Sequence, residues 1–444
     1  MPSGTARRQT LTAADSAWLR MEDPTNLMTI TSVMTFRQPI SYEDFCRRLE
    51  ETLLSHERFR LHVADPSGKL GKPAWVAGGF DIANHVVRTE LDRADQREAL
   101  RDLVGREMST PLDFSLPLWK FRFIEDFRDG SALVSRIHHC IGDGISLMKV
   151  VLAMADSEAD AVDIAKVGVH RKRGEEHGHL TSGARLLQAL KTGGSATKSL
   201  GHLLSMRADP QTLFKGPLGT RKRATWSAEV PLATVKAIGK SVGATVNDVL
   251  LAAVTESLRA YLLGRSDALP DRDLRAVVPV NIRPPDDVEL GNQFGLVYLS
   301  LPVAHAGWRE RVLAVKERMD LIKKSPEAFV VYAVLKALGA THGGLQSKVV
   351  KLLSKNATAV MTNVPGPRRP LYFCGSEIDS MMFWVPQSGR LGLGVSILSY
   401  NDRVRVGVAT DTGLVPDPET LCAGFERAIV DLEERALGTR PGDA

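Results

Sequence analysis

The segment Arg136–Ser146, with the sequence RIHHCIGDGIS, carries more information about fold and chemistry than any other part of the chain. Its pattern predicts a strand that ends at the histidine pair, followed by a tight loop and the start of a helix. Successive side chains of a strand point to opposite faces, so His138 and His139 lie on opposite sides and only one can face a cleft. An imidazole, with a pKa near ~6.5, suits proton removal from an alcohol at neutral pH. The segment therefore predicts an active site with one catalytic histidine.

The loop after the histidines contributes three further candidates. Gly142 and Gly144 are expected to let the backbone turn sharply and to let a substrate come close. Asp143 follows His139 by four residues, where its carboxylate could hold the loop or fix the histidine tautomer by a hydrogen bond or ion pair. A metal site or two core histidines are the alternatives for the pair alone. No third and fourth ligand stands at a suitable spacing, so we predict no metal.

The chain on both sides of this segment mixes strands and helices. A length of 444 residues exceeds what one core usually fills, so we expect two α/β domains at residues 1–156 and 221–444. Periodicity predicts strands at Met28–Phe36 and Ala132–His138 in the first domain, and helices at Tyr42–Ser55 and Ile145–Ala155. The second domain is predicted to hold strands at Arg275–Val280, Val297–Pro302 and Val404–Ala409, and helices at Asn247–Leu263, Trp308–Lys324 and Pro418–Arg435.

Residues 157–220 between the two domains differ in composition, with many Gly, Ser, Lys, Arg and His residues. Leucines recur there at helical spacing beside basic residues, which predicts one or two basic, weakly amphipathic helices. Such a crossover could lie on an anionic lipid surface or attract an acidic ligand. A solvated linker helix packed on the domains is the alternative.

Composition narrows the class of protein. Apolar residues make up 43% and charged residues 25%, which is typical of a globular protein rather than a disordered one. No apolar run reaches the ~18 residues of a membrane-spanning helix, so any membrane contact is expected to be peripheral. The polar, basic N-terminus lacks the apolar core of a secretory signal, and we predict a cytoplasmic location. The four cysteines match no metal or disulfide spacing and are expected to be free thiols.

Several motifs resemble those of a known family. His138-His139-x-x-x-Asp143-Gly144 is similar to the HHxxxDG signature of the chloramphenicol acetyltransferase-like superfamily. Further matches resemble the bacterial wax ester synthase/diacylglycerol acyltransferase family: Pro117-Leu118-Trp119, Asn247-Asp248, Pro279-Val280-Asn281-Ile282-Arg283, and Asn363-Val364-Pro365-Gly366-Pro367. The family usually carries Arg where Leu116 stands here. The matches extend from Asp15 to Pro418, nearly the whole chain.

The resemblance implies two chloramphenicol acetyltransferase-like domains, each a mixed sheet with flanking helices, and an active site in a tunnel at their interface. It implies transfer of a long acyl chain from acyl-CoA to diacylglycerol, a fatty alcohol or both. His139 would be the general base in a ternary complex without an acyl-enzyme, and Asn247 is a candidate to stabilise the oxyanion. Acyl-CoA would be a co-substrate, and no cofactor is expected.

The secondary motifs have structural alternatives. Asp248 could contact substrate together with Asn247, or could close a capping box with Thr245 at the start of a helix. Pro117-Leu118-Trp119 could bind substrate, but core packing that anchors the active-site strand is the favoured interpretation. The segment containing Asn363, Pro365 and Gly366 is predicted to form a rigid loop near the cleft. Arg283 is a candidate partner of Asp143 across the interface, by analogy with the superfamily.

Two other functions remain open at this point. A condensation-type acyltransferase would use a carrier-protein thioester instead of acyl-CoA. A non-catalytic protein that binds lipid inclusions would use the basic crossover and leave the histidines without a chemical role. In every case we expect contact with the inner membrane face or with lipid inclusions to be peripheral, and no binding to nucleic acid, since the basic residues lack interleaved aromatic residues.

Overall fold

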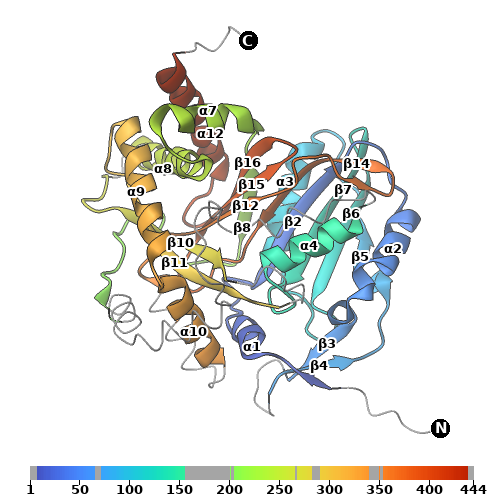
Figure 1. Cartoon of the computed structure of the whole chain (residues 1–444). Coiled ribbons are helices and arrows are strands. Elements are labelled where there is room, and N and C mark those ends of the chain that lie inside the picture. Colours follow the sequence, from blue (N-terminus) through green and yellow to red (C-terminus); the bar gives the residue numbers. More distant parts are fainter. Residues whose placement is uncertain are drawn as a thin grey trace, which may run out of the picture.

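The computed structural model describes residues 8–65, 72–155, 201, 205–265, 268–282, 291–339, 350 and 354–438. Two mixed sheets with flanking helices lie side by side, one built mainly from the N-terminal half and one from the C-terminal half (Figure 1). Each sheet has its own large hydrophobic core. The predicted crossover falls largely on residues outside those described, namely 156–200 and 202–204.

The N-terminal sheet presents the active-site strand at its centre. Its strand order is β13 (Tyr372–Phe373), β14 (Ser376–Trp384), β2 (Thr29–Phe36), β7 (Gly130–His138), β6 (Trp119–Phe127) and β5 (Val86–Arg88). Every residue of β7 is buried, because strands pair with it on both edges and helices cover the sheet. The flanking helices are α2 (Tyr42–Glu51), α3 (Gln96–Met108) and α4 (Gly144–Met154), and α4 crosses in front of the sheet in Figure 1. The predicted strands and helices of this half are thus present with small shifts at their ends.

A buried ion-pair cluster holds β7 to its neighbours. Glu107 of α3 is 5% exposed, and its carboxylate lies 2.6 Å from Arg136 Nε of β7 and 2.9 Å from Arg122 Nε of β6. Burial lowers the pKa of Arg136, and the charge of Glu107 opposes this shift. Since both arginines share one carboxylate, α3, β6 and the strand that carries the histidines are fixed to one another.

The C-terminal sheet has the strand order β11 (Phe294–Leu301), β10 (Leu274–Asn281), β12 (Ala359–Pro365), β15 (Leu393–Tyr400), β16 (Arg403–Asp411) and β8 (Lys222–Trp226), with β9 (Val230–Pro231) also paired to β16. Its helices are α7 (Leu232–Val242), α8 (Val246–Gly264), α9 (Trp308–Lys324), α10 (Glu327–Gly339) and α12 (Pro418–Leu437). Within the described residues, no single helix has the length and hydropathy to cross a membrane, and one pair bent by 96°, α7 with α8, meets those criteria only when taken together.

One hairpin from the C-terminal half belongs to the N-terminal sheet. β14 pairs with β2 in antiparallel register, with Met381 opposite Met34, although it lies between two strands of the other sheet in the sequence. The predicted C-terminal domain at residues 221–444 did not contain this exchange. Strand periodicity shows that a segment is extended but carries no information about which sheet it joins, so the sequence could not predict this exchange.

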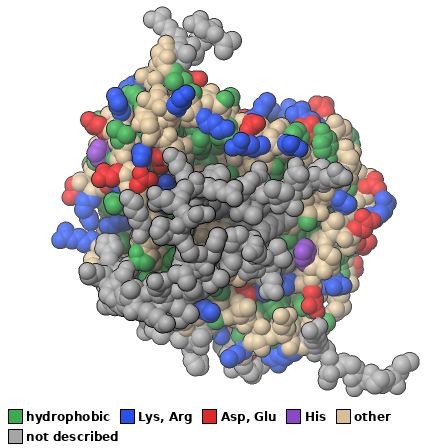
Figure 2. Space-filling model, in the orientation of Figure 1, with side chains coloured by type: hydrophobic (Ala, Val, Ile, Leu, Met, Phe, Trp, Pro, Cys, Tyr) green, Lys and Arg blue, Asp and Glu red, His purple; other side chains and the backbone are tan. Residues whose placement is uncertain are grey.

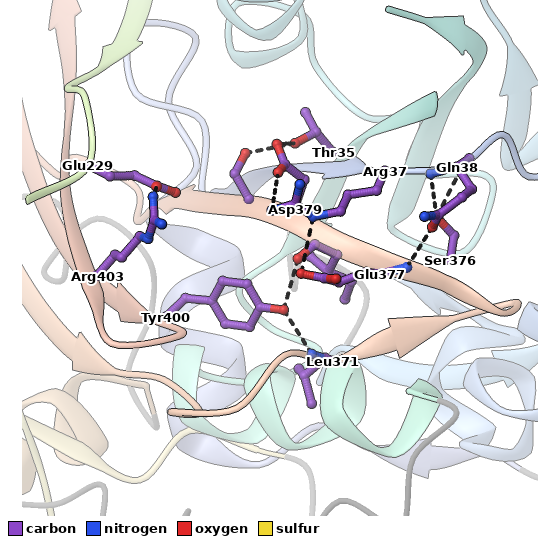
Figure 3. A network of polar contacts seen from close by, with 12 residues as sticks. Thr35, Arg37, Gln38, Glu229, Leu371, Ser376, Glu377, Asp379, Tyr400 and Arg403 are labelled. Carbon is purple, nitrogen blue, oxygen red and sulfur yellow. Dashed lines mark hydrogen bonds and ion pairs between the residues drawn. The ribbon is translucent and has the colours of Figure 1, made fainter. Parts of the chain in front are cut away.

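Polar contacts fix the exchanged hairpin at its junction with both sheets (Figure 3). The hydroxyl of Tyr400, at the end of β15, accepts a hydrogen bond from Leu371 N at 2.8 Å and donates one to Ile378 O at 2.9 Å. On the other side, Arg37 pairs with Glu377 at 3.1 Å and Asp379 at 3.2 Å. The hairpin therefore makes polar contacts with both halves of the molecule.

The visible surface carries both signs of charge. On the face in Figure 2, Lys and Arg side chains are interspersed with Asp and Glu around the periphery. The net charge of +5 is therefore not concentrated in one basic stripe on the described part of this face.

Candidate active site

His139 lies at the end of β7, where two neighbouring segments hold its backbone. His139 N donates to Met28 O at 2.8 Å, and His138 N donates to Leu118 O at 2.9 Å. The next residues form the turn that leads into α4. His139 is only 4% exposed, yet it lines the large cavity between the two halves. The position of His139 directly after the central strand therefore places its side chain at the interface between the two halves.

The cavity has a volume of about 630 Å³. Residues of β10, β11, β12, β14, β15 and β16 and of α7, α8 and α9 line it, together with four N-terminal residues: Trp18, His139, Asp143 and Gly144. Aliphatic and aromatic side chains dominate the wall, among them Leu250, Val277, Leu296, Val360, Phe383 and Val404. A mostly apolar cavity with a few polar groups is typical of a small-molecule site, and this one suits a lipid chain.

Aromatic and amide side chains surround the imidazole of His139. Trp18, from α1 (Ala13–Arg20), stacks on it with ring centroids 4.2 Å apart and an interplanar angle of 18°. The ring of Phe294 lies 5.5 Å away at 47°. His139 Nδ1 is 2.7 Å from Asn292 Oδ1, and Asn292 Nδ2 donates to Asp15 Oδ1 at 2.8 Å. The ring is thus held by stacking and by a hydrogen bond from the opposite half of the molecule.

Burial lowers the pKa of His139 to about 4, because it removes the charged ring from water. The Asp143 carboxylate and the hydrogen bond with Asn292 oppose this shift. The ring is therefore neutral at physiological pH and able to accept a proton. Once it is protonated, the carboxylate of Asp143 and the face of Trp18 are placed to stabilise the imidazolium.

This pKa leads to a prediction for the pH dependence of turnover. Catalysis by the neutral ring is lost as the pH falls through the pKa of His139, so a lowered pKa moves that loss toward more acidic pH. We expect kcat/KM to stay level from about pH 7 down to about pH 5.5 and to fall toward pH 4. A pH series with circular dichroism at each point separates this loss from acid unfolding. Half-maximal activity at pH 6.5 or above in folded protein would contradict it.

Asp143 organises the loop from within. Its side chain caps α4, since Asp143 Oδ1 accepts from Ser146 N at 2.8 Å, and its Oδ2 accepts from Gln293 N at 3.1 Å. Asp143 N in turn donates to Gly291 O at 3.3 Å. The segment Gly291–Gln293 before β11 therefore docks on the motif loop from the C-terminal half, while the ring nitrogen of His139 meets Asn292. Arg283, the predicted partner of Asp143, lies outside the described residues.

His138 has a structural environment. It is fully buried, its Nδ1 accepts from Cys140 N at 3.1 Å, and its Nε2 is 3.5 Å from Glu22 Oε2. It does not line the cavity that His139 lines. The two histidines thus face different surroundings, as strand alternation predicted, and His138 contacts the turn after β7 through Cys140 N.

The glycines act mainly through the space that they leave. Neither Gly142 nor Gly144 has a positive φ, so the turn after His138 does not depend on a left-handed glycine. A Cβ added at Gly144 would meet no atom within 4 Å, and this residue lines the cavity. At Gly366 the reason is close packing, because a Cβ there would lie 2.3 Å from Ser399 O.

Two asparagines form a polar group in the apolar wall. Asn363 Nδ2 donates to Asn247 Oδ1 at 2.8 Å, and both side chains line the cavity with Pro365. Asn363 and Pro365 belong to β12, so the predicted rigid loop is confined to the residues after the strand. Asp248 points elsewhere: it closes the capping box with Thr245, is 1% exposed and does not line the cavity. The structural alternative for Asp248 is therefore the correct one.

The segment Pro117-Leu118-Trp119 lies in the core of the N-terminal half. Leu118 and Trp119 are 0% and 1% exposed, and Trp119 Nε1 donates to Phe59 O at 2.8 Å. None of the three residues lines the cavity. Their position fits packing next to β7, the favoured interpretation, and not the alternative of substrate contact.

The residues that hold the histidine could not be identified from the sequence. Asp15 and Trp18 lie where the matches to the family begin, in Asp15-Ser16-Ala17-Trp18, but nothing in that segment indicated a role. Asn292 is 153 residues from His139 in the sequence and belongs to none of the motifs. A contact between segments so far apart leaves no local signal, so only the folded chain could show it.

Comparisons with known proteins identify the family. The model of the wax ester synthase/diacylglycerol acyltransferase catalytic domain matches residues 11–250, and that of the WS/DGAT C-terminal domain matches residues 290–433. Two relatives from Mycobacterium tuberculosis, named as probable diacylglycerol O-acyltransferases, are 28% and 27% identical to this chain. Both alignments cover 95% of this chain, and they cover 95% and 98% of the relatives.

Solved structures share the fold. A wax ester synthase/diacylglycerol acyltransferase from Marinobacter aquaeolei VT8 has a TM-score of 0.70 at 23% identity, over 96% of this chain and 100% of that one. The starter condensation domain of rhizomide synthetase has a TM-score of 0.63 at 14% identity, over 97% and 94%. These matches confirm the predicted α/β class with two sheet-containing domains. Because the two family models together extend from residue 11 to residue 433, the chain belongs to the wax ester synthase/diacylglycerol acyltransferase family.

Proposed function

We propose that this protein transfers a long-chain acyl group from acyl-CoA to the hydroxyl of diacylglycerol, a long-chain alcohol or both. The observation that carries the proposal is a buried histidine with a lowered pKa at the wall of a large apolar cavity between the two halves. Family membership supports the acyl-transfer class. The product would be triacylglycerol or a wax ester.

In the proposed reaction both substrates bind before chemistry. His139 takes the hydroxyl proton while the oxygen attacks the thioester carbonyl, which forms a tetrahedral intermediate with a negative oxygen. The carbon–sulfur bond then breaks, and the imidazolium returns its proton to the departing CoA thiolate. Holding both substrates next to one base lowers the entropic part of the barrier.

The surroundings of Cys140 favour this direct route over an acyl-enzyme on a thiol. Cys140 is adjacent to His139 but fully buried and outside the cavity lining. Burial raises the pKa of its thiol well above the usual value, so the reactive thiolate is disfavoured.

We further propose Asn247 as the donor to the oxyanion. Asn247 lines the cavity, and its Oδ1 already accepts a hydrogen bond from Asn363, so Nδ2 is the group of this amide that can donate to a substrate. A preoriented donor in a wall with few polar groups can stabilise charge that develops during the reaction.

The charges and apolar side chains around the cavity suggest how the substrates reach it. Lys236, Lys323 and Arg368 are exposed cavity-lining cations that could meet the phosphates of CoA. Leu321, 63% exposed on α9, lies two residues from Lys323. We propose a cytoplasmic protein that takes its apolar acceptor from the inner membrane face or from lipid inclusions. Flotation with anionic and neutral vesicles tests this contact, and no association with either would contradict it.

The direct experiment is CoA release from palmitoyl-CoA with dipalmitoylglycerol, with hexadecanol or with no acceptor. CoA and the ester should be quantified by liquid chromatography and mass spectrometry, because Cys46 and Cys374 are partly exposed and would react with thiol reagents. We expect acceptor-dependent CoA release with an equal amount of ester.

The outcomes separate the alternatives. The rhizomide starter condensation domain was solved with C8-CoA and Leu-SNAC, which shows that this fold can hold an acyl-CoA in another protein. Release with free palmitoyl-CoA excludes an obligatory carrier-protein donor. No release with any acceptor, in protein that still binds palmitoyl-CoA, would overturn the proposal in favour of a carrier-protein donor or a lipid-binding role.

A further inference from the structure

We infer that Asn292 is a positioning residue that fixes the tautomer of His139, with hydrogen on Nδ1 and the free lone pair on Nε2. The inference rests on the proposed function for its catalytic meaning, but the tautomer itself is a property of the folded protein. Asn292 is 5% exposed and comes from the segment before β11 that docks on the motif loop.

The contacts of the Asn292 amide determine its orientation. Its Nδ2 donates to Asp15 Oδ1 at 2.8 Å and to the backbone oxygen of His139 at 2.8 Å. An amide nitrogen has two hydrogens, and both face acceptors that have no hydrogen to give back. The side chain therefore cannot rotate its oxygen and nitrogen without losing both bonds. Its Oδ1 must face His139 Nδ1, which is 2.7 Å away.

An oxygen in that position selects one form of the ring. Since Oδ1 of an amide only accepts, the nitrogen that it meets must carry the hydrogen. The neutral imidazole then has its lone pair on Nε2, which is the nitrogen available to a substrate hydroxyl. If the Asn292 amide were reversed, its NH₂ group would face Nδ1 of His139 and favour hydrogen on Nε2. Nε2 would then have no lone pair with which to accept a proton from the substrate.

The guanidinium of Arg58 favours the ionised form of Asp15, which accepts the hydrogen bond from Asn292. Asp15 is fully buried, and burial raises the pKa of its carboxyl. Arg58 opposes this shift, with Nη2 lying 3.2 Å from Asp15 Oδ2, and its Nη1 donates to Ile141 O at 2.9 Å. Thr12 caps α1 at Asp15 N, which fixes the backbone of the aspartate. Arg58, Asp15 and Asn292 thus form a chain of polar contacts that ends at the histidine.

The neighbouring histidine provides an internal comparison. His138 Nδ1 accepts a hydrogen bond from Cys140 N at 3.1 Å, so its hydrogen lies on Nε2. Two adjacent histidines are therefore expected in opposite tautomers, because Nδ1 meets an acceptor at His139 and a donor at His138. A preference of the ring alone could not produce this difference.

The tautomers can be measured directly by long-range proton–nitrogen NMR on protein labelled with ¹⁵N-histidine. The signals of each residue are assigned by their loss in His139→Gln or His138→Gln. In the wild type we expect His139 to show a protonated Nδ1 and a bare Nε2, and His138 to show the reverse. His139 with its hydrogen on Nε2 would overturn the inference. This measurement needs neither turnover nor a folded Asn292 variant. A negative outcome would therefore overturn the tautomer assignment without bearing on the proposed function.

Asn292→Leu then tests the effect on catalysis. We expect the share of His139 with hydrogen on Nδ1 to fall, with the backbone oxygen of His139 as the remaining acceptor. We expect kcat to fall about 10- to 100-fold, with KM for palmitoyl-CoA within twofold of the wild type. Asn356→Leu is the matched control, since Asn356 is also a buried asparagine, 3% exposed, but contacts Arg275 of β10 through its backbone oxygen. A folded Asn292→Leu protein with unchanged His139 signals, or with kcat within twofold of the control, would refute the assignment.

Discussion

Replacing His139 with alanine should reduce kcat by about 10²- to 10⁴-fold, the range that a general base contributes. The reason is that the variant keeps the apolar cavity but has no group at its wall to take the hydroxyl proton. Palmitoyl-CoA should still bind, because most of the lining lies in the C-terminal half. Steady-state CoA release with a saturating acceptor measures kcat, and equilibrium binding of palmitoyl-CoA checks that the site is intact.

His85 offers a matched control for the His139→Ala variant. His85 is 1% exposed and stacks on Trp119 with ring centroids 4.5 Å apart, much as His139 stacks on Trp18, but it does not line the cavity. His85→Ala should lose stability through the cavity that it creates while kcat of the folded fraction stays near wild type. If folded His139→Ala keeps more than a tenth of the control's kcat, this residue is not the base.

Replacing Asn247 with alanine should lower kcat about 10²- to 10³-fold, as the loss of a single oxyanion donor does in other enzymes. The effect should fall on kcat more than on KM, because the negative oxygen exists only near the transition state. Rapid-quench single-turnover measurements isolate the chemical step from product release.

The structure also indicates how to separate this role from a defect in folding. The capping box of α8 uses Thr245 and Asp248, so Asn247→Ala leaves the start of the helix intact. Asn363→Ala should give a smaller loss, since it frees the Asn247 amide to rotate without removing it. Equal activity of Asn247→Ala and wild type in the single-turnover assay would exclude Asn247 as the donor.

Much of the local structure could be predicted from the sequence because it depends on neighbouring residues. The alternation before His138 indicated β7, and the spacing of Thr245 and Asp248 indicated the start of α8. The motif around Asp143 indicated a strand, a loop and a helix in that order, and the structure adds that Asp143 itself caps the helix. In each case the residues that carry the sequence pattern and the element that they form lie within one turn or one strand.

The features that could not be predicted depend on segments that meet only in the folded chain. Asn292 reaches His139 because the segment before β11 docks across the interface, and nothing in its immediate neighbours reveals that destination. Leu118 and Trp119 stand close to the motif in the chain, yet they pack behind the strand in the core. Distance along the sequence was therefore a poor guide to which residues meet the substrate.

The exchange of β14 also has a consequence for biosynthesis. A ribosome completes β2 and β7 long before it reaches Trp384, so the nascent N-terminal half exposes the edge of β2 that β14 later covers. Unpaired hydrophobic edges of this kind are prone to aggregation and attract chaperones. The two halves should therefore complete their folding together, after the hairpin has been translated. The N-terminal half expressed alone should be insoluble unless a peptide spanning β14 is supplied with it.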